Sequence, residues 1–179
     1  PSLAAQVAAK PYDVLNSDEA RAEVSGKPLS FLHVGKPEID LPRDVDLYDP
    51  RVYQKGAENL RKLIADGVLR EDPRPCLYIY AQTMGGHTQY GIVGCASVAE
   101  YLNDTIKKHE LTRKDKEDGR PRHVEVTNAH SGPIFLTYRA RPELDRIVAH
   151  VTASSPVNDF TAEDGIGHRL WVISDPATI

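Results

Sequence analysis

The dipeptide Gly85-Gly86 lies between two apolar runs, and it constrains the fold more than any other feature of the sequence. Two-residue turns between antiparallel strands favour glycine, because their central residues adopt positive φ angles. We therefore expect a hairpin with strands over residues 76–83 and 89–97. In this register Leu77, Ile79 and Ala81 share one face of the hairpin with Ile92, and either face can be covered by other elements. The opposite face carries Tyr78, Tyr80 and Val93.

Both cysteines fall within this hairpin. Cys76 and Cys95 lie opposite each other in the expected register, a geometry that permits a disulfide. The N-terminal stretch has no basic region and does not read as a secretory signal. We therefore expect a cytoplasmic protein with two reduced, buried thiols.

Two helices in the first third of the chain have clear start and stop signals. Asn16 and Ser17 are cap candidates for a helix over residues 18–24, which Gly26 ends. Asp49 caps a longer helix that has proline at its first position and closes at Gly67. One face of the longer helix is expected to be buried, with apolar residues at helical spacing: Tyr53, Ala57, Leu60 and Ile64.

Later signals predict further elements. Ser97 and Glu100 have the spacing of a capping box for a short helix through Leu102, and Thr112 is a cap candidate for another. Gly119 and Pro121 are expected to end or kink that helix, because proline lacks the amide donor and clashes with the preceding turn. Residues 142–151 predict a helix with Leu144, Ile147 and Val148 inward. A long loop is expected over 36–49, and strands over 30–34, 133–139, 160–163 and 168–173.

Together these elements predict an α+β fold with a mixed, mainly antiparallel sheet and helices packed on it. With 179 residues, the chain suits one domain or at most two small ones, and we expect one domain over residues 1–179. The tripeptide Ser174-Asp175-Pro176 has the form of a helix start with only three residues after it. We therefore expect the chain to be the N-terminal part of a longer protein.

Composition argues against nucleic acids and membranes as partners. The net charge is −4, whereas nucleic-acid binding requires an overall or clustered positive surface. No apolar run approaches the roughly 20 residues that span a bilayer, so no membrane association is expected.

A basic island over residues 107–122 is the best candidate site, with seven Lys or Arg residues against four acidic ones. On a helix, one face would carry His109, Arg113, Lys116 and Arg120. Arginine there can clamp a phosphate bidentately, and lysine can neutralise a transferring group. Glu110 or Glu117 can accept the proton of a substrate hydroxyl, which makes them the candidate catalytic residues. The alternative is a solvated, charge-rich helix in which Arg113 pairs with Glu117.

Other motifs are weaker. Tyr12 and Asp13 can contact a ligand, or they can hold the first turn in place. His109-Glu110 begins like a zinc-protease helix, but Arg113 stands where the second metal ligand would be, and no metal site is expected. The Gly85-Gly86 segment lacks the Gly-Lys-Ser/Thr of a phosphate loop, so a hairpin turn explains it better.

Seven motifs, in this order and spacing, resemble those of one family: Pro-Tyr-Asp-Val-Leu at 11–15, Ser-Phe-Leu-His-Val at 30–34, Lys-Pro-Glu-Ile-Asp-Leu-Pro at 36–42, Thr-Met-Gly-Gly at 83–86, Lys-His-Glu-Leu-Thr-Arg at 108–113, Gly-Pro-Ile-Phe-Leu at 132–136 and Leu-Trp-Val-Ile at 170–173. Over nearly its whole length the chain is similar to the N-terminal part of the bacterial family known as domain of unknown function 1015. It departs from the family pattern at Lys10, where another proline is common, and at 119–121, which interrupts a usually continuous helical pattern.

The resemblance implies a wider relationship. Complete members carry a C-terminal Asp-Gly-His-His-Arg motif, which resembles one in free-serine kinases related to the ParB and sulfiredoxin folds. This chain contains no such motif.

The leading functional hypothesis combines this resemblance with the basic island. It is a nucleotide-dependent phosphotransferase that uses magnesium and acts on a small hydroxylated metabolite, such as a free amino acid. In that case the chain supplies the part of the site that binds the anion or nucleotide, and by itself it is inactive. The alternatives are a non-catalytic ligand-binding or scaffold module that docks on the missing C-terminal part, and a DNA-associated regulator, which the acidic balance disfavours.

Overall fold

The computed structural model describes residues 2–108 and 114–175. The chain divides into two compact units. The sheet unit comprises Pro1–Ala5, Glu71–His109 and Leu136–Ile179, and the helical unit comprises Gln6–Arg70 and Glu110–Phe135. A short helix, α1 (Ala4–Val7), spans the division between them.

The sheet unit contains four antiparallel strands in the order β2-β1-β4-β3. Their bounds are β1 (Leu77–Met84), β2 (His87–Val93), β3 (Asn158–Thr161) and β4 (Gly167–Ile173). The hairpin between β1 and β2 turns at Gly85 and Gly86, which both have positive φ angles. The α+β class with a mainly antiparallel sheet is thereby confirmed, while one domain over residues 1–179 stays a prediction.

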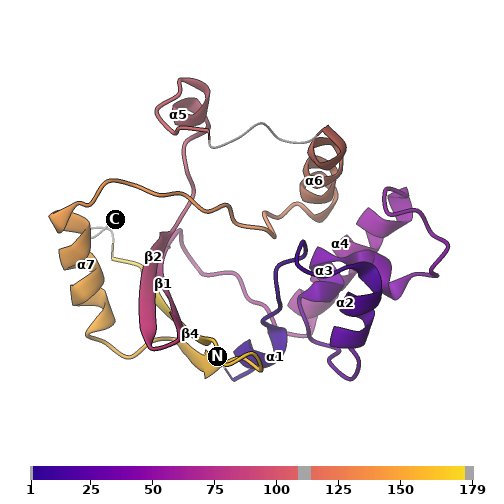
Figure 1. The fold of residues 1–179 in the computed structure, drawn as a ribbon, viewed down its shortest axis with the longest axis horizontal. Helices are drawn as coiled ribbons and strands as arrows, with labels where there is room; N and C mark the ends of the chain where they lie inside the picture. Colours follow the sequence, from indigo (N-terminus) through magenta and orange to yellow (C-terminus); the bar gives the residue numbers. More distant parts are fainter. Residues whose placement is uncertain (1, 109–113, 176–179) are drawn as a thin grey trace. The chain divides into compact units, whose positions relative to one another are not determined.

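Helix α7 (Pro142–Thr152) covers one face of this sheet, as Figure 1 shows. Its residues Ile147, Val148 and Val151 pack against the buried side chains of Ile79, Ala81, Trp171 and Ile173. Leu77 and Ile92, which share a face with Ile79 and Ala81 in the predicted register, also pack there. A short helix, α5 (Val98–Leu102), follows β2, and the Ser97 hydroxyl accepts from the Glu100 amide, which is the Ser97 half of the predicted capping box.

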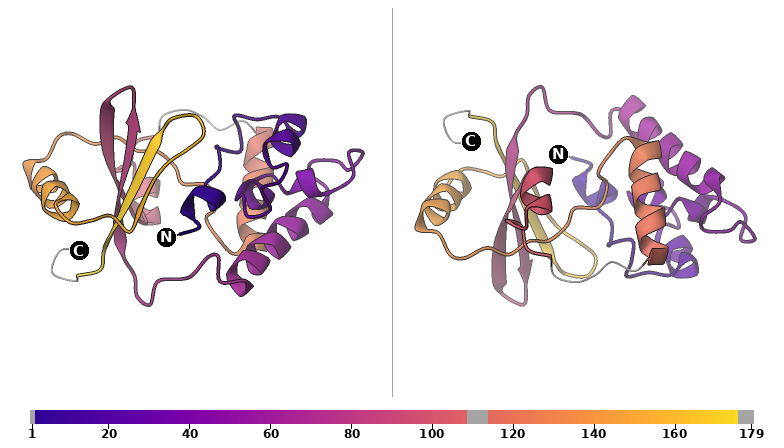
Figure 2. Two further views of the ribbon diagram at one scale, coloured as in Figure 1. Left: turned by 90° about the horizontal axis from the view of Figure 1, so that it is seen from below. Right: turned by 90° about the horizontal axis from the view of Figure 1, so that it is seen from above.

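The helical unit contains α2 (Ser17–Glu23), α3 (Leu32–Gly35), the 3-10 helix η1 (Pro37–Asp40), α4 (Pro50–Ala65) and α6 (Lys114–Thr127). Helices α4 and α6 lie side by side in both views of Figure 2 and are in contact. One apolar cluster joins Ala20, Leu32 and Ile39, and another joins Val34, Leu60 and Leu63.

The predicted caps of α2 and α4 are confirmed. Asn16 and Glu19 form a reciprocal capping box at α2, and the Asp49 carboxylate accepts from the Arg51 amide at α4. The buried face of α4 contains Tyr53, Ala57 and Leu60 as predicted, but Leu63 completes it, while Ile64 is exposed.

Two predicted strands are wrong. Residues 30–34 form a turn and the start of α3, because a helical turn places Leu32 in one apolar cluster and Val34 in the other. Residues 133–139 pair with no strand in the described part of the chain, and their apolar side chains are exposed, with Ile134 at 76% and Phe135 at 77%.

Helix α6 does not end at Pro121 but continues to Thr127. A tertiary contact offsets the lost backbone hydrogen bond, since His123 beyond the proline is buried and hydrogen-bonded to Val34. The thiols of Cys76 and Cys95 are free. The prediction that both are buried is wrong, because both cysteines lie outside the strands and Cys95 is exposed. Thr112 and the helix start at Pro176 lie outside the described residues.

Candidate functional site

Arg120 occupies a fixed position on α6. Its guanidinium carbon lies 3.5 Å from the ring centroid of Tyr12, which precedes α2 in the same unit. A guanidinium over a tyrosine ring is held by attraction to the negative face of the ring. On its other side, a side chain at Gly132 would begin only 2.8 Å from Arg120 Nη2, so glycine leaves the space that the guanidinium needs.

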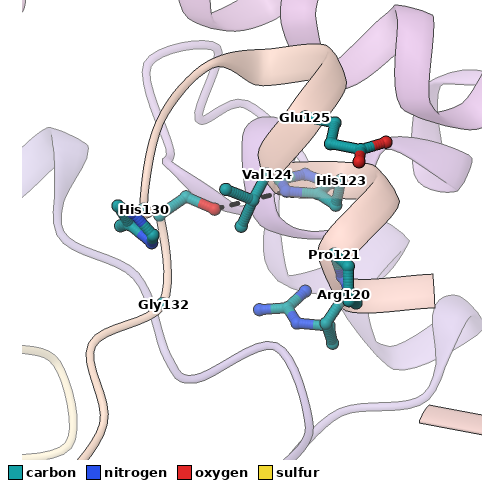
Figure 3. Close-up of a pocket in the computed structure, with 8 residues that line it drawn as sticks. Arg120, Pro121, His123, Val124, Glu125, His130 and Gly132 are labelled. Carbon is teal, nitrogen blue, oxygen red and sulfur yellow. Dashed lines mark hydrogen bonds between the residues drawn. The ribbon is translucent and has the colours of Figure 1, made fainter. Parts of the chain in front are cut away.

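A hollow of about 450 Å³ opens beside Arg120. Its walls come from one turn of α6 and from the loop after that helix, namely Arg120, Pro121, His123, Val124, Glu125, His130, Ser131 and Gly132. In Figure 3 the Arg120 guanidinium reaches toward the loop that carries His130 and Gly132, while the Glu125 side chain is directed away from it. The hollow therefore presents the Arg120 cation on the side of this loop, and the Glu125 carboxylate, which also lines it, is directed the other way.

His123 forms the floor of the hollow and is only 4% exposed. Its Nε2–H donates to the carbonyl oxygen of Val34, 2.9 Å away, and its Nδ1 lies 3.4 Å from the hydroxyl of Ser131. Burial lowers the pKa of His123 below 6.5, with the Val34 hydrogen bond opposing this effect and the Arg120 charge adding to it. The imidazole is therefore neutral at pH 7, and its Nδ1 carries a free lone pair.

The other described cations of the basic island have partners of their own. The Nζ of Lys107 lies 2.8 Å from an Asp104 carboxylate oxygen, and Lys108 lies over the Tyr101 ring. Arg122 lies over the ring of Tyr53 at 5.3 Å. Arg120 also lines the hollow described above.

The predicted site residues are placed as follows. Arg120 and Tyr12 are brought together, and Asp13 is exposed. His109, Glu110 and Arg113 lie outside the described residues. Lys116 and Glu117 belong to α6, but their side chains lie outside the part of the chain that the structure describes.

Sequence reasoning missed the other half of this hollow: His123, His130, Ser131 and Gly132. The sequence contained a signal for His123, because a helix that continues past Pro121 places it three residues after Arg120, on the same side of the helix. The prediction that the helix ends or kinks at Pro121 kept His123 from being grouped with Arg120.

Among residues 2–108 and 114–175, no three His, Cys, Asp or Glu side chains gather as metal ligands would. The same residues contain no helix with the length and apolar character that crossing a bilayer requires.

A protein-family model matches the whole chain. The model of the family described as "Protein of unknown function (DUF1015)" matches residues 1–179, and the chain belongs to that family. No curated protein and no solved structure matches the chain.

Proposed function

We propose that this DUF1015 member binds a small phosphorylated or carboxylate ligand in the hollow beside Arg120, and that it serves in this way as part of a nucleotide-dependent phosphotransferase. The observation that carries the proposal is the Arg120 guanidinium, stacked on Tyr12 and directed into that hollow. A fixed guanidinium loses little freedom when it binds an anion, and its planar fork matches the oxygens of a phosphate or carboxylate.

The size and lining of the hollow support a small ligand. About 450 Å³ lies within the range of small-molecule sites, which is roughly 300–1,000 Å³. Beside the cation it offers the hydroxyl of Ser131 and the imidazole of His130, which are polar groups that can orient a ligand. The chain as a whole is acidic, so attraction of an anion must come from a local group such as Arg120.

Phosphoryl transfer suits such a site, because it depends mostly on positioning and on neutralising charge. In this proposal the nucleotide binds with magnesium, and the acceptor is a small hydroxylated metabolite such as a free amino acid. Lys116 supplies further positive charge, and Glu110 or Glu117 takes the proton of the acceptor hydroxyl.

Calorimetry tests the binding proposal. Phosphate and magnesium–ATP are titrated into the wild-type chain, Arg120→Ala and Arg122→Ala. We expect Arg120→Ala to weaken binding at least about tenfold, since a hydrogen bond to a charged group contributes about 1.5–3 kcal/mol. Arg122→Ala removes a neighbouring cation that does not line the hollow, so it should bind like wild type. Equal loss in both variants, or heats unchanged by Arg120→Ala, would remove the hollow from consideration.

A second candidate function is a non-catalytic module that docks on another part of the same protein. It is favoured by the apolar residues exposed between Gly132 and Arg139, namely Ile134, Phe135, Leu136 and Tyr138. This candidate predicts that the chain binds the dye ANS and that Phe135→Ser reduces the fluorescence. No enhancement with the wild-type chain would argue against it.

A further inference from the structure

We infer that Ser131 is an activated hydroxyl that accepts a phosphoryl group, with the Nδ1 atom of His123 as its base. Both side chains line the hollow beside Arg120, and the Ser131 oxygen lies 3.4 Å from His123 Nδ1. Figure 3 marks this interaction between the loop and α6. The inference goes beyond the proposed function, because it assigns a nucleophile and not only a binding site.

The tautomer of His123 follows from its other nitrogen. The carbonyl oxygen of Val34 can only accept a hydrogen bond, so Nε2, 2.9 Å away, must carry the proton. In a neutral imidazole Nδ1 is then the acceptor, and the Ser131 hydroxyl donates to it. This is the arrangement of nucleophile, base and orienting group that activated hydroxyls require.

The imidazole is held rigidly in this orientation. Its ring is buried against α4, where a side chain at Gly56 would begin only 3.3 Å from Nε2. The hydroxyl of Thr127 donates to the carbonyl oxygen of His123 at 2.6 Å, which fixes the backbone on the next turn. The contact to Ser131 is long for a hydrogen bond, as is usual for catalytic contacts before a substrate binds.

The surroundings of His123 keep it available as a base. Burial has the largest effect and lowers the pKa of the imidazole, and the hydrogen bond to Val34 opposes it. The charge of Arg120 on the same helix lowers this pKa further, and that of Glu38 in η1 raises it. Helix α4 approaches the ring through Gly56. A base of this kind accepts a proton at neutral pH and loses this ability only when the solution is acidic enough to protonate it.

The phosphoryl step balances with the groups present. The Ser131 oxygen attacks phosphorus, an oxygen–phosphorus bond forms, and the bond from phosphorus to the leaving group breaks. The hydroxyl proton passes to His123 Nδ1, and the leaving group departs with the bonding electron pair. Arg120 neutralises charge on the phosphoryl oxygens. With a nucleotide as donor, the leaving group is the nucleoside diphosphate, and this last assignment alone rests on the proposed function.

Diisopropyl fluorophosphate tests the nucleophile without any nucleotide, because its phosphorus–fluorine bond is broken by an activated serine. The whole chain is treated with the reagent at pH 7.5, and adducts are located by mass spectrometry of peptides. We expect one adduct, on Ser131, and none in Ser131→Ala. Ser154 is the internal control, because its hydroxyl donates to a backbone carbonyl, that of Val151, and should stay unlabelled.

The variant His123→Gln separates the role of the base from its structural role. Glutamine can keep the amide donor toward Val34, but its amide oxygen is not basic and cannot take up the Ser131 proton. We expect labelling to slow by about 100-fold or more, the usual contribution of a general base. In the wild type the labelling rate should fall as the pH is lowered through the range in which His123 takes up a proton, a readout that remains if the variant does not fold.

Three results would overturn the inference: no adduct on Ser131, adducts spread evenly over exposed serines, or a labelling rate that is independent of both pH and His123. None of them bears on the calorimetric test, since phosphate binding to Arg120 needs no nucleophile. Failure of this inference and failure of the proposed function are therefore distinguishable.

Discussion

Replacing Gly56 by alanine tests how closely α4 must pack against His123, one of the residues that line the hollow. Gly56 lies inside α4, and an added Cβ would stand 3.0 Å from Pro37 Cγ, 3.3 Å from His123 Nε2 and 3.3 Å from the carbonyl oxygen of Val34. Two of these neighbours form the hydrogen bond that orients His123, so the methyl group would push against that bond from the side.

Two opposing effects set the expected change in stability. Alanine in a helix interior is favoured over glycine by about 1 kcal/mol. Overpacking a well-filled site costs about 1–3 kcal/mol, and weakening a buried hydrogen bond costs about 1 kcal/mol more. We therefore expect Gly56→Ala to lower the free energy of unfolding by about 1–3 kcal/mol, against the helix propensity.

Urea unfolding followed by circular dichroism measures this change, and Gly119→Ala is the matched control. Gly119 also lies inside a helix, but its added Cβ would meet mainly the ring of Tyr48, which is 49% exposed and can rotate away. We expect the control to be as stable as wild type or more stable, by up to about 1 kcal/mol. A Gly56→Ala variant that equals or exceeds wild-type stability would refute the proposed close packing of α4 on His123.

Three further predictions concern pH. Burial lowers the pKa of His123, so the native state binds fewer protons there than the unfolded chain, and the free energy of unfolding should fall as the pH drops below 6.5. The His123→Gln variant should lose less stability over the same range. Chemical denaturation at several pH values measures both losses, and equal losses would contradict the prediction. A hydrogen bond to the Asp72 carboxylate raises the pKa of Tyr78 to about 12, and the stability this gives should be lost between pH 10 and 12. In an ultraviolet titration, Asp72→Asn should move the pKa of Tyr78 toward 10, and an unchanged titration curve would exclude the hydrogen bond between Tyr78 and Asp72. Hydrogen bonds from Arg51 lower the pKa of Asp49 to about 2. The stability that the ionised Asp49 contributes should therefore be complete above pH 3.8 and be lost as the pH falls to about 2. Carboxyl NMR should place the Asp49 midpoint near 2 in wild type and higher in Arg51→Ala, although the backbone amide of residue 51 still holds it below 3.8.

The elements that the sequence predicts correctly are those specified by local chemistry. Asn16 and Asp49 cap their helices through hydrogen bonds to amides two or three residues away, and Gly85 and Gly86 adopt the backbone angles that a tight hairpin needs. Because each signal acts within a few residues, no knowledge of the rest of the fold is required.

The errors arise where distant contacts decide. Residues 30–34 have β-type composition, but Leu32 packs in one apolar cluster with α2 and η1, and Val34 packs in another with α4. Pro121 would break an isolated helix, yet the helix continues because His123 reaches Val34, far away in the sequence. Local propensity is a weak prior, and tertiary packing overrides it.

The candidate site shows the same division. Arg120 and Tyr12 could each be selected from the sequence, one from a basic helix and the other from a motif near the N-terminus. Their stacking depends on the fold, and so does the Ser131 contact, since a loop residue becomes a partner of His123 only after α6 passes the proline.

The strand order also has a consequence for biosynthesis. Strand β1 lies between β2 and β4, but β4 begins at Gly167, more than eighty residues after β1 ends at Met84. At typical elongation rates of about 5–20 residues per second, the nascent hairpin waits roughly 4–17 s for its neighbour. During that interval one edge of β1 is open, and the Ile79 and Ala81 face stays uncovered until α7 has also been synthesised, so the nascent hairpin is exposed to wrong pairing.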